Sequence, residues 1–241
     1  MEVLVLKAQC IKQRAWFYLR QLPIRVVRLF KQMIVFDFSF GILEGLFLYF
    51  MTIVLCFLDL FAIPEIYETI MDLSKWNTRA LTKRERLIAN VVFTDSINLN
   101  MVRIDERAII GPKWGRFAYV SYHTINSYGK ISDAVLVHEL MHVWQFTHLG
   151  SRYIINALLA QKSKDGYDYK GLLRMHEIIN EGKTILDFNF EQQADIICDY
   201  YRVAVGDRAQ WSTADREDLD SYQYFVNQVQ NPKFLNLNFS V

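Results

Sequence analysis

Two histidines and a glutamate lie within one strongly apolar stretch of the sequence, Val137-His138-Glu139-Leu140-Met141-His142-Val143-Trp144-Gln145. The apolar spacing predicts a helix buried on most sides, with Ser132 and Asp133 placed to cap its first turn. Residues i and i+4 share one face of a helix, so His138 and His142 can bind the same metal ion. Glu139 lies about 100° around the helix, beside such an ion. The set favours a Zn²⁺ site in which the glutamate takes a proton from a water on the metal.

A zinc site that does chemistry needs a third protein ligand and one open position. The segment 188–201 is a second helical pattern, in which Glu191 and Asp195 share a face at i, i+4. One carboxylate can complete the zinc shell, while the other accepts the free ring N–H of a ligating histidine. Cys198 lies on a similar face. We interpret it as a buried free thiol rather than a ligand, because cysteine often serves as a small core residue.

These residues carry a resemblance to known families. His138-Glu139-x-x-His142 followed by Glu191-x-x-x-Asp195 resembles the gluzincin pattern of thermolysin-type peptidases. The full sequences of the two stretches, with Phe-Glu-Gln-Gln-Ala-Asp in the second, more closely resemble a family of small bacterial zinc peptidases often found beside Rhs, Vgr and injection-system genes. The resemblance covers about residues 80 to 205. It implies that His138, His142 and Glu191 bind Zn²⁺, that Glu139 is the general base, and that Asp195 orients His138.

Peptide hydrolysis also needs a hydrogen-bond donor aimed at the developing oxyanion. Tyr167, Tyr169 and His176 lie between the two metal-binding segments and are the candidates. We prefer Tyr169 as the catalytic donor, and the alternative for each candidate is a packing role. We expect His123 to be a hydrogen-bonded surface histidine, because no second histidine or carboxylate has an obvious metal-binding spacing to it.

The segment 1–34 mixes seven basic residues with many apolar ones. This pattern predicts two basic amphipathic helices, broken near Pro23 and suited to an anionic bilayer surface. The alternative is a solvated helical hairpin packed on the catalytic domain.

The next block, 40–64, is the most apolar part of the chain. Fourteen uncharged residues separate Glu44 from Asp59, which makes about 21 Å of helix, and the flanks supply the rest of a membrane-spanning length. We expect this block to bind membrane lipids as a spanning or deeply interfacial segment, at the bacterial inner membrane. The alternative is a helix buried in an oligomer or against the catalytic core. Basic residues on the two flanks nearly balance, so the side of the membrane stays undecided.

The composition limits the class of protein. The 241 residues carry a net charge of +1, which argues against a general nucleic-acid surface. The three cysteines show no C-x-x-C pair, so a disulfide framework is not expected. We expect a basic and hydrophobic helical region at 1–64, a connector at 65–81, and a zinc metallopeptidase-like domain at 82–241.

Within that domain the sequence predicts an α+β fold, mostly helical with a small sheet, and the resemblance implies that this fold is zincin-like. Thr82-x-x-Glu85 is a capping box for a helix, and the segments 97–104 and 117–122 are predicted strands. Ser212 and Thr213 are placed to cap a last helix, which continues to about Gln230.

The expected function is that of a membrane-associated, zinc-dependent metallohydrolase, with peptides or proteins as its favoured substrates. Two alternatives stay open. One is a zinc-containing binding or scaffold protein at the membrane, in which a side chain such as Cys198 closes the metal site. The other is metal-assisted hydrolysis of an ester or of a different amide. The oligomeric state is unknown.

Overall fold

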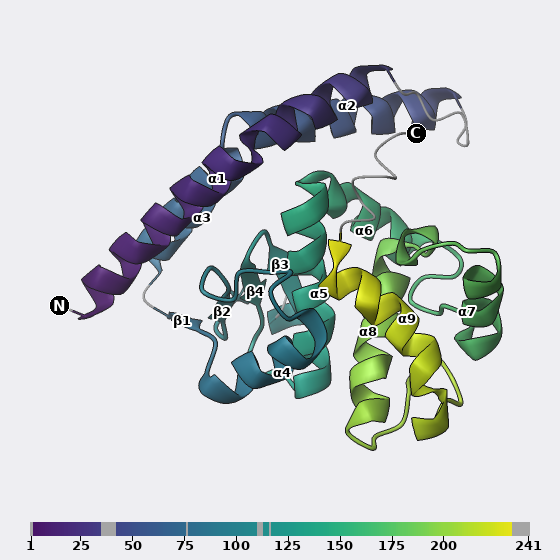
Figure 1. Cartoon of the computed structure of the whole chain (residues 1–241). Helices are drawn as coiled ribbons and strands as arrows, with labels where there is room; N and C mark the ends of the chain where they lie inside the picture. The colour runs from purple at the N-terminus through teal and green to yellow at the C-terminus, as the bar shows by residue number, and fades with distance from the viewer. Residues whose placement is uncertain (1, 35–41, 76, 110–112, 116, 233–241) are drawn as a thin grey trace.

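The computed structural model describes residues 2–34, 42–75, 77–109, 113–115 and 117–232 (Figure 1). The elements follow in this order: α1 (Glu2–Ile34), α2 (Ile42–Leu60), α3 (Ile63–Ser74), β1 (Thr78–Ala80), α4 (Lys83–Phe93), β2 (Arg103–Asp105), β3 (Tyr119–Ser121), β4 (Thr124–Asn126), α5 (Asp133–Leu149), α6 (Arg152–Lys162), α7 (Gly171–Asn180), the 3₁₀ helix η2 (Ile185–Asp187), α8 (Phe190–Ala204), the 3₁₀ helix η3 (Arg216–Asp218) and α9 (Leu219–Gln230).

The strands form a small mixed sheet. Among the described residues it has four strands in the order β1-β2-β4-β3, with β2 parallel to β4 and the other two pairs antiparallel. The chain is therefore mostly helical with a small sheet, as the α+β prediction expected. β2 and β3 are shorter than the strands predicted at 97–104 and 117–122, and the sequence did not predict β1 or β4. Asn98 to Met101 turn back on themselves instead of extending, with the Met101 N–H donating to the Asn98 carbonyl at 2.9 Å.

Helix α5 is central to the domain, packed against α4, α6 and α8. Trp144 in this helix is fully buried, and its indole Nε1 donates to the Val229 carbonyl of α9 at 2.9 Å. Two predicted caps are confirmed: the Ser132 hydroxyl accepts from the Val135 N–H, and Thr82 and Glu85 form a reciprocal capping box. The last helix begins later than predicted, because Asp215 caps η3 and α9 starts only at Leu219.

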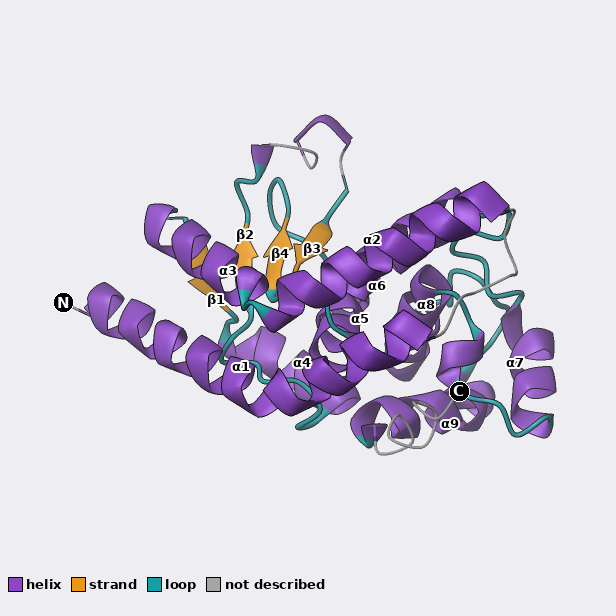
Figure 2. Cartoon of the chain, turned by 90° about the horizontal axis from the view of Figure 1, so that it is seen from above, coloured by secondary structure: helices purple, strands orange, loops and turns teal. Residues whose placement is uncertain are grey.

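The first three helices form a layer above the domain. Helix α1 runs antiparallel to α2 and then α3, and the view from above shows this pair of rows crossing the domain (Figures 1 and 2). Buried ion pairs join the rows: Arg25 Nη2 lies 2.5 Å from Glu65 Oε1, and Arg14 Nη1 lies 3.3 Å from Asp72 Oδ2. We call α1, α2 and α3 together the helical arm.

The arm differs from two predictions. Helix α1 continues through Pro23, so the break expected there is wrong. Pro23 is exposed, so the helix carbonyl that loses its hydrogen-bond partner at this position can bond to water. Two residues further on, an ion pair with Glu65 holds Arg25 in place. The expected connector at 65–81 is also wrong, because α3 and β1 fill most of it.

Buried polar contacts fasten the arm to the domain. Arg28 Nη2 donates to the His148 carbonyl at 2.9 Å, and the Ser151 N–H donates to Asp59 Oδ2 at 2.9 Å. Gly150 lies between these contacts with φ +74°, and a Cβ there would collide with the Arg28 and Asp59 side chains. Only glycine therefore suits the junction of α5 and α6.

His123 belongs to the same seam. Its backbone N–H donates to Glu68 Oε1 at 2.7 Å, and its Nδ1 lies 2.9 Å from Glu68 Oε2. The residue is 2 % exposed, so the expectation of a surface histidine is wrong. Glu68 comes from α3, in the segment that the sequence suggested was a connector.

Candidate metal centre

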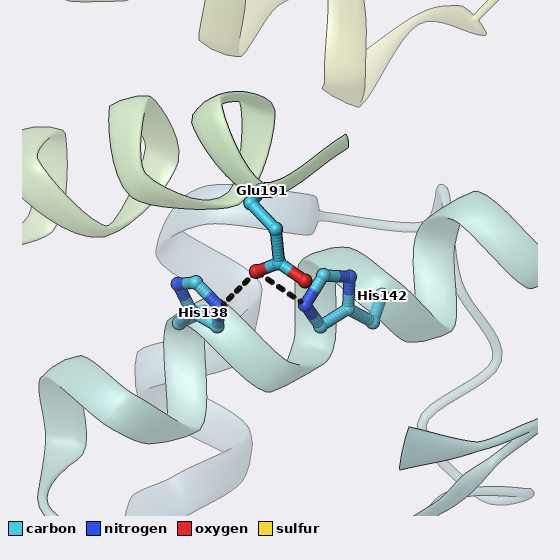
Figure 3. Close-up of side chains that lie close together, drawn as sticks. All are labelled: His138, His142 and Glu191. Atoms are coloured by element: carbon cyan, nitrogen blue, oxygen red, sulfur yellow. Dashed lines mark ion pairs between the residues drawn. The ribbon is translucent and has the colours of Figure 1, made fainter. Parts of the chain in front are cut away.

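Three side chains from two helices converge at the centre of the domain. His138 and His142 project from one face of α5, and Glu191 descends toward them from the first turn of α8 (Figure 3). Glu191 Oε2 lies 3.3 Å from His138 Nε2 and 3.4 Å from His142 Nε2. The ligand atoms of the three residues all lie within 4.8 Å of one another. Two imidazole nitrogens and a carboxylate oxygen are a donor set that suits Zn²⁺.

The position of Glu191 follows from local sequence. Asn189 caps α8, and its Oδ1 accepts from the N–H groups of Glu191 and Gln192 at 3.0 and 2.9 Å. Glu191 Oε1 accepts from Gln161 Nε2 of α6 at 2.8 Å. The other oxygen, Oε2, is buried with no hydrogen-bond partner. A buried carboxylate oxygen that faces two imidazole nitrogens without a donor is what a metal ligand requires, so the residues fit the ion.

Each histidine has a partner on its far nitrogen. His138 Nδ1 lies 2.8 Å from Asp195 Oδ1, and the second oxygen of Asp195 accepts from the indole Nε1 of Trp211 at 2.5 Å. His142 Nδ1 lies 2.8 Å from Gln145 Oε1. With both Nδ1 atoms donating to these oxygens, both Nε2 lone pairs are directed at the metal position. Asp195 therefore stands where the sequence predicted it, beside His138.

Charges in the centre are strongly coupled. Burial opposes ionisation of Glu191, yet His142 and His138 hold its pKa well below the usual range. Burial likewise opposes charging of His138, but Asp195 and Glu191 raise its pKa well above the ordinary value. Glu139 is 4 % exposed, one of its carboxylate oxygens has no partner, and burial raises its pKa.

The centre opens into a cavity of about 1280 Å³, which His138, Glu139, His142 and Glu191 line in part. The edge strand β3 contributes Tyr119 and Val120 to the wall, and α6 contributes apolar side chains. Cys198 also lines the cavity, but its Sγ donates to the Ala134 carbonyl at 3.2 Å. In the described part of the chain the clustered ligand set is His138, His142 and Glu191, and the thiol is not in it.

The structure corrects the choice of Tyr169 as catalytic donor. Its side chain is fully buried outside the cavity, and its hydroxyl donates to Asp199 Oδ2 at 2.9 Å and contacts the Tyr222 hydroxyl at 2.7 Å. His176 is exposed on α7, also away from the cavity, and bonds to Ser221. Tyr167 does line the cavity, with its ring centroid 6.1 Å from that of His138. Burial and the carboxylate of Glu191 raise the Tyr167 pKa, so its phenol stays protonated and able to donate.

Sequence reasoning missed three contributors to the centre: Gln145, Gln161 and Trp211. Gln145 follows His142 at i+3, a helical spacing that puts the two side chains together, so this signal was present in the sequence. Gln161 and Trp211 come from other elements, α6 and the segment after α8. Their contacts depend on the packing of those elements, and no local pattern marks them.

Comparison with known proteins gives a partial and distant likeness. The chain is 28% identical over 139 residues to the type VI secretion system spike protein VgrG2b of Pseudomonas aeruginosa, a stretch that covers 51% of this chain and 13% of that protein. The likeness agrees with the Vgr-associated setting suggested by the sequence. No protein-family model matches the chain, and no solved structure matches it.

Proposed function

We propose that this protein is a zinc-dependent metallohydrolase and that its substrates are peptides. One observation carries the proposal: two imidazole nitrogens and an unpartnered carboxylate oxygen meet beside the buried Glu139, in the wall of an open cavity. A Zn²⁺ ion held by His138, His142 and Glu191 would lower the pKa of a bound water toward about 7 and polarise the scissile carbonyl.

The chain's own groups have separate tasks in this reaction. Glu139 accepts the proton of the attacking water and returns it to the leaving nitrogen. Asp195 and Gln145 hold the two imidazoles in the tautomer that keeps Nε2 free. Tyr167, at the cavity wall, donates a hydrogen bond to the oxyanion, the role for which Tyr169 had been preferred.

The shape of the cavity supports a peptide over a smaller ester or amide. Its volume of about 1280 Å³ is large for a small molecule. Among the described strands β3 pairs with β4 alone, and on its other edge the Tyr153 hydroxyl donates to the Val120 carbonyl at 2.8 Å, so an extended main chain would pair with the part of this edge that precedes that carbonyl. A structural zinc site in a scaffold protein is the weaker alternative, because a closed site needs a fourth protein ligand and Cys198 already bonds to Ala134.

Two measurements on purified full-length protein test the proposal. Elemental analysis should find one zinc per chain in both the wild type and Glu139→Gln. A proteomic cleavage screen should find products with the wild type alone, since loss of a general base costs about 10² to 10⁴ in rate. Zinc in both proteins with no cleavage by either would favour the scaffold alternative. Equal cleavage by both would remove Glu139 from the reaction.

A further inference from the structure

Exposed apolar side chains of the helical arm lie on the sides of its helices that face away from the domain. In α1 the contacts to the domain come from positions such as Phe17, Gln21 and Arg28. At 100° per residue, the opposite side of the helix holds Trp16, which is 63 % exposed, and Phe30, which is 61 % exposed. This side of α1 is therefore apolar and faces the solvent instead of packing against the domain.

Helices α2 and α3 repeat the arrangement. Their inward positions include Asp59, Glu65 and Glu68, which are buried in contacts with α1 or with the domain. Their outward positions recur at helical spacing and are all apolar and exposed. We call the outward positions of the three helices the outer face: Trp16, Leu19, Val27 and Phe30 of α1; Phe47, Phe50, Val54 and Phe57 of α2; Phe61 between α2 and α3; and Ile63, Ile66, Ile70 and Leu73 of α3.

The buried acids of the arm are paired with arginines on its inner side, and most of the charges left exposed are positive. The acids Asp59, Glu65, Glu68 and Asp72 all point inward and are buried. Among the described side chains of the arm, the exposed charges are those of Lys12, Arg20, Lys31 and Glu44, three positive and one negative. The exposed surface thus combines broad apolar stripes with an excess of positive charge, the composition that binds anionic lipid.

We propose that the outer face lies flat on an anionic lipid bilayer, with α2 in the interface and not across it. Helix α2 is long and apolar enough to span, with a mean hydropathy of 1.9 over Leu43–Leu60. The helix is, however, tied at two positions: Tyr49 donates to the Met33 carbonyl of α1 at 2.8 Å, and Asp59 accepts from the Ser151 N–H of the domain at 2.9 Å. A spanning α2 would have to break the exposed bond to Met33 or the buried bond to Ser151, whereas a face-on arm keeps both.

Vesicle flotation of the full chain tests the contact. The wild type should float with vesicles of phosphatidylcholine and phosphatidylglycerol and bind much less to phosphatidylcholine alone. The double variant Phe30→Glu, Phe50→Glu should lose at least tenfold in binding. Leu173→Glu with Val205→Glu, at exposed apolar positions of the domain, is the matched control and should bind as the wild type does.

Two matched triple variants test how much the positive charges contribute to vesicle binding. Replacing Lys12, Arg20 and Lys31 together by Gln should weaken binding to the anionic vesicles on the order of a hundredfold, at about fivefold for each charge. Replacing Lys83, Lys164 and Arg208 by Gln removes the same charge from exposed positions of the domain and should have little effect. Equal losses in the two triple variants would overturn the proposed orientation.

Depth measurements separate the flat arm from a span. Nitroxide labels on Phe47→Cys, Val54→Cys and Phe61→Cys should lie at one shallow depth. In a spanning α2, positions seven residues apart would differ in depth by about 10 Å, which would overturn the proposal. A stable dimer in lipid-free solution that fails to bind vesicles would instead assign the face to a second copy of the chain. None of these readouts depends on zinc or on hydrolysis.

Discussion

His142 and Gln145 form a hydrogen bond within a single helix, from Nδ1 of the imidazole to Oε1 of the amide at 2.8 Å. The same amide donates through Nε2 to the Phe190 carbonyl at 2.9 Å and to Gln193 Oε1 at 3.0 Å. Gln145 thus fixes the orientation of one candidate ligand and also joins α5 to the first turn of α8. That turn carries Glu191, so one side chain sets the separation of two parts of the metal centre.

Gln145→Leu should weaken zinc binding 10- to 100-fold, because the His142 ring loses its orienting acceptor and α8 loses a tether. Competition with a chromophoric chelator measures the affinity. Gln223→Leu, a change in α9 far from the centre, is the control and should bind zinc normally. An affinity unaltered by Gln145→Leu would mean that packing alone orients the imidazole.

Glu191→Gln should lower the zinc content of the purified protein well below one ion per chain, because the anionic ligand becomes a neutral amide while the shape of the side chain is kept. Elemental analysis after dialysis against a weak chelator gives the content. Glu177→Gln, an exposed glutamate on α7, is the matched control. Full occupancy in Glu191→Gln would exclude this carboxylate from the ligand set.

Substitution of Tyr167 and of Tyr169 by Phe should have opposite effects on activity and stability. Tyr167→Phe removes the donor at the cavity wall and should lower kcat by at least tenfold with little change in unfolding. Tyr169→Phe leaves Asp199 and Tyr222 short of a partner and should cost about 1 to 3 kcal/mol of unfolding free energy with kcat retained. Peptide turnover and urea denaturation of both variants provide the two readouts. The reverse pattern would restore Tyr169 as the catalytic donor.

Because of His148, the free energy of unfolding should fall in mild acid. Burial lowers its pKa from 6.5 to about 4, while its Nε2 stays bonded to the Ser96 carbonyl at 2.8 Å. Between these two pKa values the unfolded chain binds the proton and the folded chain does not. The stabilisation from a neutral His148 is therefore complete above about pH 6.5 and is lost as the pH falls to about 4, by roughly 3 kcal/mol.

His148→Gln keeps a donor for Ser96 but does not titrate, so its unfolding free energy should fall less than that of the wild type over this range. Urea denaturation at several pH values from 4 to 7.5 measures both proteins. Parallel stability curves for the two would show that another group carries the acid sensitivity.

Local signals in the sequence were enough to predict the framework of the candidate metal centre. The spacing of His138 and His142 on a buried helix, and of Glu191 and Asp195 on another, follows from 3.6 residues per turn and requires no knowledge of packing. The caps at Ser132 and Thr82 are equally local, and both are present.

Features set by distant contacts were not predictable in this way. Glu65, Glu68 and Asp72 line one side of α3, and their partners lie in α1 and near β4. Because those partners are distant in the sequence, the polar residues of this segment indicate a connector when they are read locally. The choice between Tyr167 and Tyr169 depends on the path of one loop. That loop ends at Lys170 in a left-handed conformation with φ 66°, which no apolar periodicity encodes.

Asp59 and Glu68 reach from the helical arm into the body of the protein, where Ser151 and His123 depend on them. A fragment cut at residue 82 would leave those polar groups without their acceptors and uncover the surface that the arm shields. The two halves are therefore not interchangeable modules. Grafting the part of the chain after residue 82 onto a different carrier would require the whole seam to be redesigned, including the glycine at position 150.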